Sequence, residues 1–289
     1  MSLPEVFRRF NRSWSQRVGL LEASHLGTGR PLNQSRLLFE IAQFPDGAGV
    51  LDLRERLGLD SGYLSRMLAQ LADEGLVEVK EDALDRRRRA ARLTDRGRRA
   101  AEELDDRSEQ LVERVVEPLT PGQRARLEEA LTTADLLIRA ATLEVREVPP
   151  DSALAQEALV NYFAELDARF PGGFDPGDQP IDMAAVCLAA VSDGRLAAFG
   201  AYRALTSTDV EIKRLWVSPD WRGAGVASRL MRLLEGRAAA QGFARVVLDT
   251  NENLPEAVAL YDHLGYERIA RYNDNPYATS FHAKRLARG

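Results

Sequence analysis

The chain has 289 residues, of which 45% are hydrophobic and 29% charged, enough apolar sequence for about two ordinary domains. It lacks both an apolar run of the roughly 20 residues that span a bilayer and the apolar stretch of a secretory signal, so we expect a cytoplasmic protein with no membrane partner. Its one cysteine, Cys187, excludes an internal disulfide and any multi-thiolate metal site, and with only three histidines no metal is expected.

The first half of the chain is predicted to be mainly helical, with one two-stranded ribbon. Apolar residues recur there at helical spacing, in segments separated by glycine and proline. The predicted helices span residues 4–23, 33–43, 51–57, 62–74, 97–117 and 121–140. Residues 76–80 and 88–93 are predicted strands, joined by the charged segment 81–87.

The order of these predicted elements is that of a DNA-binding motif: a helix, a short turn, a second helix, and a ribbon with a basic tip. The second helix can lie in the major groove, while arginines at the ribbon tip can reach the phosphates or the minor groove. The net charge is −5, yet residues 80–99 contain nine basic and four acidic residues. The candidate DNA contacts are Ser61, Tyr63, Ser65 and Arg66 on the second helix and Arg86, Arg87 and Arg88 at the tip.

Several segments of this half together resemble the MarR family of transcriptional regulators. They are residues 58–66 (GLDSGYLSR), 75–77 (GLV), 85–87 (DRR) and 93–97 (LTDRG), within a match that covers about residues 1–142. The resemblance implies a mainly α winged helix-turn-helix domain that binds double-stranded DNA. It also implies a homodimer, held through the helices predicted at 4–23, 97–117 and 121–140. The alternative is that the arginine run is only a solvated loop.

The second half, residues 143–289, is predicted to be α/β, with the domain boundary near residue 142. A strand at 210–217 is followed by a turn and by residues 222–227 (RGAGVA), which open an amphipathic helix. A strand, a glycine-rich loop and a helix N-terminus can bind a pyrophosphate. The third glycine of the dinucleotide fingerprint is replaced by Ser228, and the sequence has no P-loop, so neither of those nucleotide sites is favoured.

Two motifs in this half resemble the GNAT superfamily of N-acetyltransferases, over about residues 143–289. The first is Arg-x-x-Gly-x-Ala at 222–227, and the second is the run 257–266 (AVALYDHLGY). The resemblance implies an α/β fold with a mixed central sheet, acetyl-CoA as cofactor and an amine as acceptor. An asparagine that many members carry is replaced here by Leu254, with Asn253 one residue earlier. The cofactor contacts so implied are Leu215, Trp216, Val217, Arg222, Gly223, Ala224, Gly225, Val226, Ala227 and Asn253.

The resemblance assigns catalytic roles within this half. Tyr261 matches the tyrosine that protonates the departing thiolate, although it could also be an aromatic residue that packs a helix onto the sheet. A backbone N–H near Leu215 or Trp216 would stabilise the oxyanion. Glu211 is the candidate base, expected on one strand face with Lys213, Leu215 and Val217; its alternatives are an ion pair or a contact to the substrate ammonium.

Two irregular segments are expected to wall the acceptor site. Residues 163–182 contain a Gly/Pro-rich stretch, and residues 273–277 (NDNPY) form a second candidate wall. They favour a small polar amine over an open peptide groove. Lys213 and Arg214 either bind a substrate carboxylate or are solvated. Cys187 lies in an apolar run and is expected to be a core residue.

Three functions are compatible with these patterns. The chain is expected to combine a DNA-binding regulator with a working acetyltransferase that transfers the acetyl group directly in a ternary complex. Alternatively, it is a regulator whose second half senses acetyl-CoA or a metabolite without turnover. In the third case it is an acetyltransferase that uses its first half only to dimerise. Turnover with an amine separates the first and third from the second, and salt-dependent DNA binding separates the first two from the third.

Overall fold

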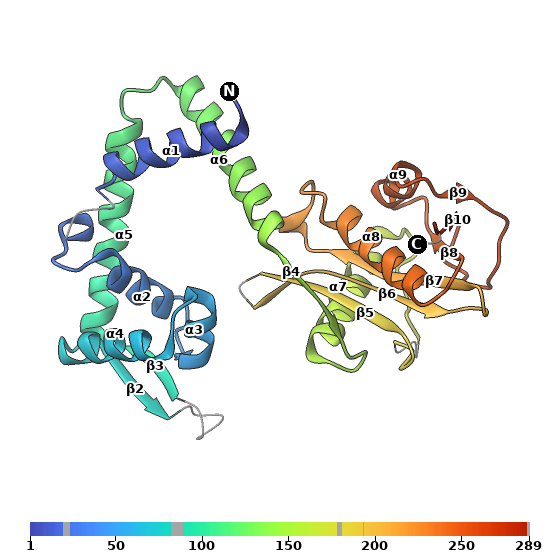
Figure 1. Cartoon of the computed structure of the whole chain (residues 1–289), viewed down its shortest axis with the longest axis horizontal. Coiled ribbons are helices and arrows are strands. Elements are labelled where there is room, and N and C mark those ends of the chain that lie inside the picture. Colours follow the sequence, from blue (N-terminus) through green and yellow to red (C-terminus); the bar gives the residue numbers. More distant parts are fainter. Residues whose placement is uncertain (20–23, 82–88, 178–180, 193, 288–289) are drawn as a thin grey trace. The chain divides into compact units, whose positions relative to one another are not determined.

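The computed structural model of the protein describes residues 1–19, 24–81, 89–177, 181–192 and 194–287 (Figure 1). The chain divides into two compact units, Met1–Glu128 and Glu129–Gly289. In the described ranges, no helix has the length and apolar character needed to cross a membrane.

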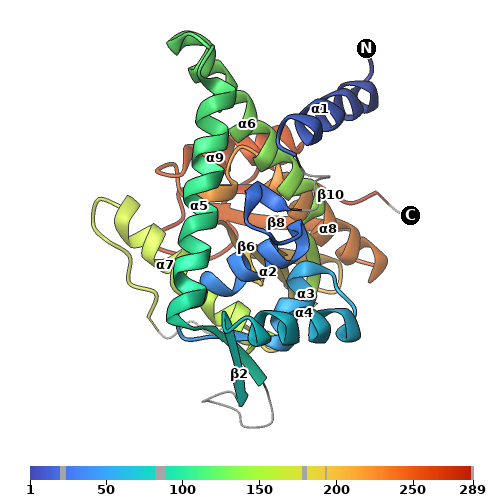
Figure 2. The ribbon, with the colours of Figure 1, turned by 90° about the vertical axis from the view of Figure 1, so that its left-hand side faces the viewer.

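The first unit is a winged helix-turn-helix, which confirms the predicted fold. A three-stranded antiparallel sheet, in the order β1-β3-β2, packs beside the helices. Figure 2 shows β2 and α4 at one end of the long helix α5. The helices are α1 (Leu3–Arg17), α2 (Leu32–Ala42), α3 (Val50–Leu57), α4 (Ser61–Asp73) and α5 (Asp95–Val116), with the short 3-10 helix η1 (His25–Gly27). The strands are β1 (Ala48–Gly49), β2 (Val77–Glu81) and β3 (Arg89–Leu93).

Short sequence signals set the ends of these helices. The Asp60 side chain caps α4 by accepting a hydrogen bond from the Tyr63 N–H at 2.8 Å. Thr94 caps α5 in the same way, accepting from the N–H of Gly97 at 3.0 Å. A Cβ on Gly97 would lie 2.0 Å from the backbone oxygen of Leu76, so only glycine fits there. The glycine of the Leu-Thr-x-x-Gly segment is therefore required by the close packing of α5 against the backbone at Leu76.

Two details of the first unit differ from the sequence prediction. The helix expected at 4–23 ends earlier, because α1 stops at Arg17 and Gly19 has a φ of +62°. Residues 20–23 lie outside the described part of the chain. The short strand β1, which pairs with β3 at Ala48 and Gly49, was not predicted, because two residues carry too little periodicity to be recognised.

The second unit has a mixed seven-stranded sheet, as the predicted fold class requires. The strand order is β4-β5-β6-β7-β8-β10-β9, and within the described residues only the β7–β8 pair is parallel. The strands are β4 (Glu144–Val148), β5 (Val186–Ser192), β6 (Arg195–Ala204), β7 (Asp209–Val217), β8 (Arg245–Thr250), β9 (Glu267–Arg268) and β10 (Ser280–Arg285).

Helices cover both faces of this sheet. Helix α7 (Ala153–Arg169) shares a hydrophobic core with Cys187, Phe199 and Trp216, which confirms that Cys187 is a core residue. Burial raises the pKa of the Cys187 thiol to about 11. Helix α8 (Val226–Ala240) packs in the core of the opposite face, which also includes Tyr261 of α9 (Pro255–His263). The 3-10 helix η2 (Pro219–Trp221) precedes the glycine loop.

Helix α6 (Pro121–Thr142) runs through the division between the two units. Its C-terminal end belongs to the second unit, in which Ala140 of the helix and Leu143, the residue after it, join the α8 core. Arg229 of α8 also donates hydrogen bonds to the carbonyl oxygens of Ala140 and Leu143, at 3.0 and 3.3 Å. The domain boundary near residue 142 remains a prediction.

A β-bulge interrupts β7 opposite β6. Lys213 pairs with Ala201 and Trp216 with Phe199, so β7 has one more residue than β6 between these pairs. Arg214 takes up the extra residue with a φ of +59°. The bulge shifts the alternation of side chains, so the predicted common face for Glu211, Lys213, Leu215 and Val217 is wrong beyond Lys213.

Candidate active site

The central feature of the second unit is the point where β7 and β8 separate. The two strands pair at three positions only, the last of which joins Glu211 to Val247. Beyond it, β8 continues to pair with β10, and β7 with β6. Two cavities lie along the opening, one on the side of the glycine loop and one at the end of β8.

The glycine-loop cavity has a volume of about 380 Å³. It is lined by the end of β7, the loop before α8, the first turn of α8, and residues of α7 and α9. Of the expected cofactor contacts, it contains Leu215, Trp216, Val217, Arg222, Gly223, Gly225, Val226 and Ala227. Ala224 instead packs against the α8 core, and the exposed Asn253 lies outside the lining.

The backbone of the glycine loop is shaped for close approach of a ligand. Gly223 and Gly225 have φ values of +78° and +74°, and a Cβ built on either would meet no atom within 4 Å. The N–H of Arg229, which bonds to the Gly225 oxygen at 3.0 Å, is the donor that closes the first turn of α8. The N–H groups of residues 226–228 come before it, at the end of the helix that carries partial positive charge.

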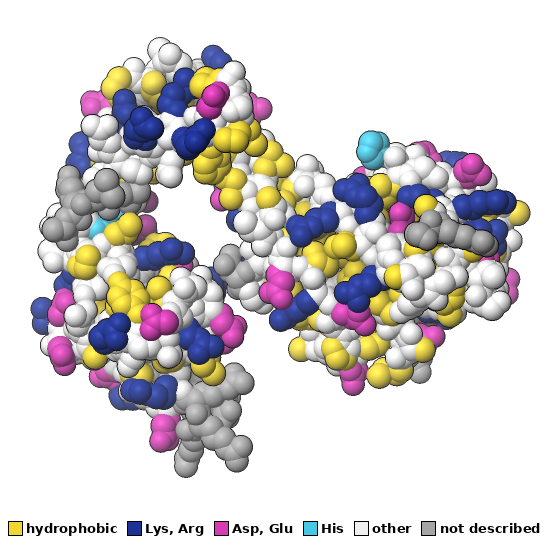
Figure 3. Space-filling model, in the orientation of Figure 1, with side chains coloured by type: hydrophobic (Ala, Val, Ile, Leu, Met, Phe, Trp, Pro, Cys, Tyr) yellow, Lys and Arg dark blue, Asp and Glu magenta, His cyan; other side chains and the backbone are white. Residues whose placement is uncertain are grey.

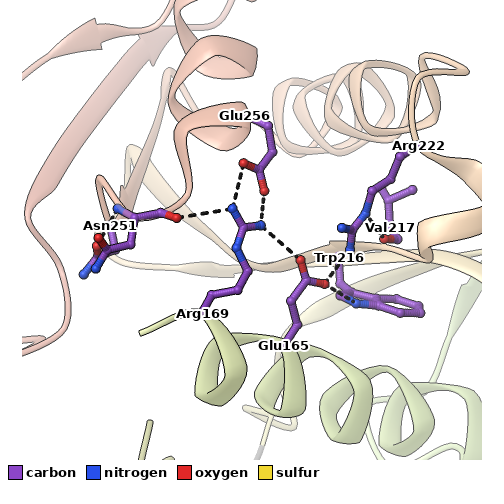
Figure 4. A network of polar contacts seen from close by, with 8 residues as sticks. Glu165, Arg169, Trp216, Val217, Arg222, Asn251 and Glu256 are labelled. Atoms are coloured by element: carbon purple, nitrogen blue, oxygen red, sulfur yellow. Dashed lines mark hydrogen bonds and ion pairs between the residues drawn. The ribbon is translucent and has the colours of Figure 1, made fainter. Parts of the chain in front are cut away.

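A network of ion pairs connects α7 to this loop (Figure 4). The Glu165 carboxylate accepts hydrogen bonds from Arg222 at 2.6 Å, Trp216 Nε1 at 3.1 Å and Arg169 at 3.2 Å. Arg169 also contacts the Glu256 carboxylate of α9, which lowers the pKa of Glu256. The Arg222 Nε donates to the Val217 carbonyl oxygen at 3.2 Å. Glu165 thus holds the guanidinium of the loop and the indole of β7 at the edge of the cavity.

The strand-end cavity has a volume of about 370 Å³. Both expected acceptor walls contribute to it, the first through Phe170 and Phe174 and the second through residues 273–277. Its other walls are residues 212–215 of β7 and the end of β8 with the residue after it, 249–251. Both cavities are lined by Tyr162, Leu166, Leu215, Leu254 and Ala257, so they meet beside the bulge.

Tyr261 lies in the strand-end cavity, within a buried aromatic group. Its ring is 5.7 Å from that of His282 and 5.8 Å from that of Tyr266. Burial raises its pKa above the usual value, so the phenol keeps its proton at neutral pH. This location is compatible with a proton donor at the junction, and the catalytic role of Tyr261 remains a prediction.

Glu211 is fully buried and lines neither cavity. Its carboxylate accepts from Arg203 at 2.8 Å, Tyr272 at 3.0 Å and Asn273 at 3.2 Å, with Lys213 Nζ at 3.3 Å. These contacts match the ion-pair alternative, and the role of base remains a prediction.

Among the described residues two carboxylates line the strand-end cavity: Asp274 of the second expected wall, and Asp249, which the sequence analysis missed. It lies 3.5 Å from Lys213 Nζ and accepts a hydrogen bond from Asn275. Its only sequence signal was an acidic residue near the end of a buried strand.

The structure describes four of the seven candidate DNA contacts. Ser61, Ser65 and Arg66 are exposed at the start of α4, and the Tyr63 hydroxyl pairs with the Asn33 side chain. The Arg66 guanidinium lies 5.8 Å from the Tyr63 ring centre. The other three candidates, Arg86, Arg87 and Arg88, lie outside the described residues.

Comparison with known families gives one match in each half of the chain. The model of the acetyltransferase (GNAT) family matches residues 157–266, and that of the MarR family matches residues 28–88. The uncharacterized N-acetyltransferase YjgM of Escherichia coli is 35% identical over 80 residues, which cover 27% of this chain. The match spans about half of that relative's own length, 48%.

Two solved structures are each similar to about half of this chain. An acyl-CoA N-acyltransferase from Klebsiella pneumoniae is 26% identical and covers 51% of this chain and 99% of its own, with a TM-score of 0.42. A MarR family transcriptional regulator from Rhodococcus sp. RHA1 is 18% identical and covers 46% of this chain and 95% of its own, with a TM-score of 0.38. On the two family matches, the chain contains a MarR family domain followed by a GNAT family acetyltransferase domain.

Proposed function

We propose that the second unit transfers an acetyl group from acetyl-CoA directly to a small amine while both are bound. The observation that carries this proposal is the meeting of the two cavities at Leu215, where β7 and β8 have separated. A thioester in the glycine-loop cavity and an amine in the strand-end cavity would meet there. The chain's one cysteine, Cys187, lines neither cavity, which supports direct transfer rather than an acyl-cysteine route.

The glycine loop supports coenzyme A as the acyl carrier. Its two glycines leave the backbone open to a diphosphate, and the first-turn N–H groups of α8 offer donors at the positive end of the helix dipole. Arg222 adds a formal positive charge beside them. We therefore assign the diphosphate to Arg222 and to the backbone of residues 223–228. In that position the Arg222 guanidinium would leave its ion pair with Glu165 and bind a phosphate group instead.

Acetyl-CoA supplies a thioester, and the residues at the junction would move the protons and stabilise the charge that develops during transfer. An ammonium has no lone pair, so the amine must first lose a proton, and Asp249 is placed to attract the ammonium and assist that loss. Backbone N–H groups in the bulge around Leu215 would stabilise the negative charge that develops on the carbonyl oxygen. Tyr261 would donate its proton to the departing sulfur. Glu211 would then act by positioning Lys213 beside Asp249.

Initial-rate kinetics with acetyl-CoA and a panel of small amines tests this proposal. We expect amine-dependent thiol release, with intersecting rather than parallel double-reciprocal lines, because both substrates must be bound before transfer. Calorimetry with acetyl-CoA gives a separate measure of binding. No heat at millimolar acetyl-CoA, together with no thiol release for any amine, would contradict the proposal.

We also propose that the first unit binds double-stranded DNA as a homodimer. The exposed start of α4 supports a helix in the major groove, since Ser61, Ser65 and Arg66 all face solvent there. Helix α1 supports the dimer, because it has no buried residue while Phe7 and Phe10 are 51% and 50% exposed. Figure 3 shows hydrophobic and basic side chains together over α1.

Salt-dependent binding to the DNA upstream of the protein's own gene tests the regulator. Arg66→Ala should weaken binding and reduce the salt slope by about one if Arg66 contacts a phosphate. The matched control is Arg114→Ala, which removes an exposed arginine from the far end of α5. Equal affinities and slopes for the wild type and both variants would place the DNA contact elsewhere.

A further inference from the structure

We infer that Lys213 is a site of self-acetylation, in which its Nζ receives the acetyl group from acetyl-CoA bound in the same molecule. The inference rests on the proposed acetyltransferase function and goes beyond it, because it assigns a modification of the protein rather than a small-molecule product. It follows from three observations: the place of Lys213 in the strand-end cavity, the contacts of its ammonium, and the distance from it to the junction of the two cavities.

Lys213 lies where β7 and β8 separate. Glu211, two positions before it, is the last residue of β7 that pairs with β8, and the bulge follows directly after Lys213. Lys213 lines the strand-end cavity, and 30% of its side chain is exposed. The chain therefore carries a primary amine of its own in the cavity that we assign to the acceptor amine.

The Lys213 ammonium occupies the place that we propose for the ammonium of the acceptor. Its Nζ lies 3.5 Å from Asp249, the carboxylate assigned to attract the acceptor, and 3.3 Å from Glu211. Both carboxylate side chains are almost fully buried, so Lys213 is held on the inner wall of the cavity rather than extended into solvent. An incoming ammonium and Lys213 thus compete for Asp249, and the carboxylate that assists one can assist the other.

The junction with the glycine-loop cavity is within reach of this side chain. Leu215, which lines both cavities, is two residues further along β7. Two residues of extended chain span at most about 7 Å. A lysine carries its amine on a flexible four-carbon stem, so rotation of that stem can bring Nζ from Asp249 to a thioester held at Leu215.

The transfer follows the same chemistry as for a free amine. The Lys213 ammonium gives up two protons in all, and Asp249 is placed to assist the first loss. The nitrogen lone pair forms the new bond to the acetyl carbon. The electrons of the C–S bond leave with sulfur, which takes up one proton, while the other proton passes to solvent. The products are an acetylated Lys213 and free coenzyme A.

The small number of lysines provides internal controls. Of the 39 lysines and arginines, only Lys80, Lys213 and Lys284 are lysines. Lys284 matches Lys213 in exposure, at 26%, and is also paired with a carboxylate, Glu235 at 2.7 Å, but it lines neither cavity. Lys80 is 71% exposed, on β2 of the first unit. Chemical acetylation from solution should therefore favour Lys80, whereas transfer in the active site should favour Lys213.

Incubation of the full chain with acetyl-CoA alone, followed by mass spectrometry of the intact protein and of its peptides, tests the inference. We expect one acetyl group per chain, on Lys213. It should be added at least about 10-fold faster than at Lys80 or Lys284, because an amine held beside the thioester gains from proximity. Without any added amine, the same incubation should release a burst of one thiol per chain.

Two variants and a competitor separate this reaction from chemical labelling. Lys213→Arg keeps a positive charge beside the two carboxylates and removes the acceptor, so it should abolish both the mass increase and the burst. Lys284→Arg is the matched control and should keep both. Excess coenzyme A should slow the modification of Lys213 and leave any slow labelling of Lys80 unchanged. The labelling pattern of the wild type decides the inference even if Lys213→Arg does not fold.

Three results would overturn the inference. The first is labelling that follows exposure, with Lys80 modified before Lys213. The second is modification of Lys213 at a rate that excess coenzyme A does not change. The third is a rate constant that rises with protein concentration, since donor and acceptor would then belong to different molecules.

Failure of the proposed function has a different signature. Without acetyl-CoA binding in calorimetry and without thiol release for any amine, the function and this inference fall together. If a small amine is acetylated, yet Lys213 stays unmodified during incubation with acetyl-CoA alone, the function stands and the inference is wrong.

Discussion

Replacement of Glu165 by glutamine should tighten the binding of acetyl-CoA, because Glu165 and the diphosphate compete for Arg222. In the free protein the Arg222 guanidinium donates to Glu165 at 2.6 Å, and it would have to leave this contact to reach a phosphate. The side chains are 42% and 22% exposed, so solvent screens the pair and its strength is about 0.2–1 kcal/mol. Removal of that competition corresponds to a dissociation constant lower by about 1.4- to 5-fold.

Glutamine preserves the other contacts of this position. Its amide oxygen can still accept from Trp216 Nε1, and Arg169 keeps its pairing with Glu256. Isothermal titration of acetyl-CoA at low and high salt is the assay, since screening should reduce the difference between the proteins. Glu157→Gln, an exposed substitution on the same helix, controls for the loss of one negative charge on α7.

A double-mutant cycle makes this prediction specific to Arg222. Arg222→Ala should weaken binding by a larger factor in the Glu165→Gln background than in the wild type, because there the arginine has no carboxylate to leave. Weaker or unchanged binding in a Glu165→Gln protein with a normal melting temperature would refute the reasoning. It would mean that Glu165 orients Arg222 for the ligand rather than withholding it.

Three further predictions address the acid, the dimer and the buried thiol. Tyr261→Phe should lower kcat by about 100-fold with acetyl-CoA binding largely kept, and an unchanged kcat would contradict the acid role. Because burial raises the Tyr261 pKa, the wild type should lose no activity through this group below about pH 10, and an alkaline loss near pH 8 that Tyr261→Phe abolishes would contradict the raised pKa. Phe7→Ser combined with Phe10→Ser should convert a dimer into a monomer in sedimentation experiments without unfolding it, since neither ring is buried. Cys187, with its pKa raised to about 11, should react with a chromogenic disulfide at pH 8 only after denaturation, whereas rapid reaction of the folded protein would show that β5 is accessible.

Sequence patterns predicted those parts of the fold in which a residue acts on its near neighbours along the chain. The helix-turn-helix follows from apolar spacing and from caps such as Asp60 and Thr94, which act within one turn and are therefore readable in order along the chain. The glycine loop is equally local, because Gly223 and Gly225 need their positive φ values for the turn itself. These are the parts of the molecule in which a residue's neighbours in sequence are also its neighbours in space.

The charged groups of the site were harder to predict, because they depend on contacts between distant segments. Glu211 meets Tyr272 and Asn273, about sixty residues further along the chain, and these contacts seal it away from both cavities. Asp249 reaches the strand-end cavity because it lies beyond the last residue of β8 that pairs with β7, where β8 remains paired with β10 alone. No spacing rule within either strand contains that information.

The bulge in β7 shows that one extra residue in a strand changes which side chains lie on each face of the sheet. Regular alternation would have put Arg214 on the face opposite Lys213, in line with the α8 core. Gly200 of β6 was the available signal, since a glycine inside a strand pattern often marks a bulge. A Cβ at Gly200 would lie 3.0 Å from Leu234 and 3.4 Å from Leu215, so the glycine also lets α8 pack closely over the irregular segment. The same extra residue removes Leu215 from the ladder with β6 and brings the Arg214 guanidinium to the cavity, so a backbone donor for the acetyl oxygen and a charged group of the cavity wall have one structural origin.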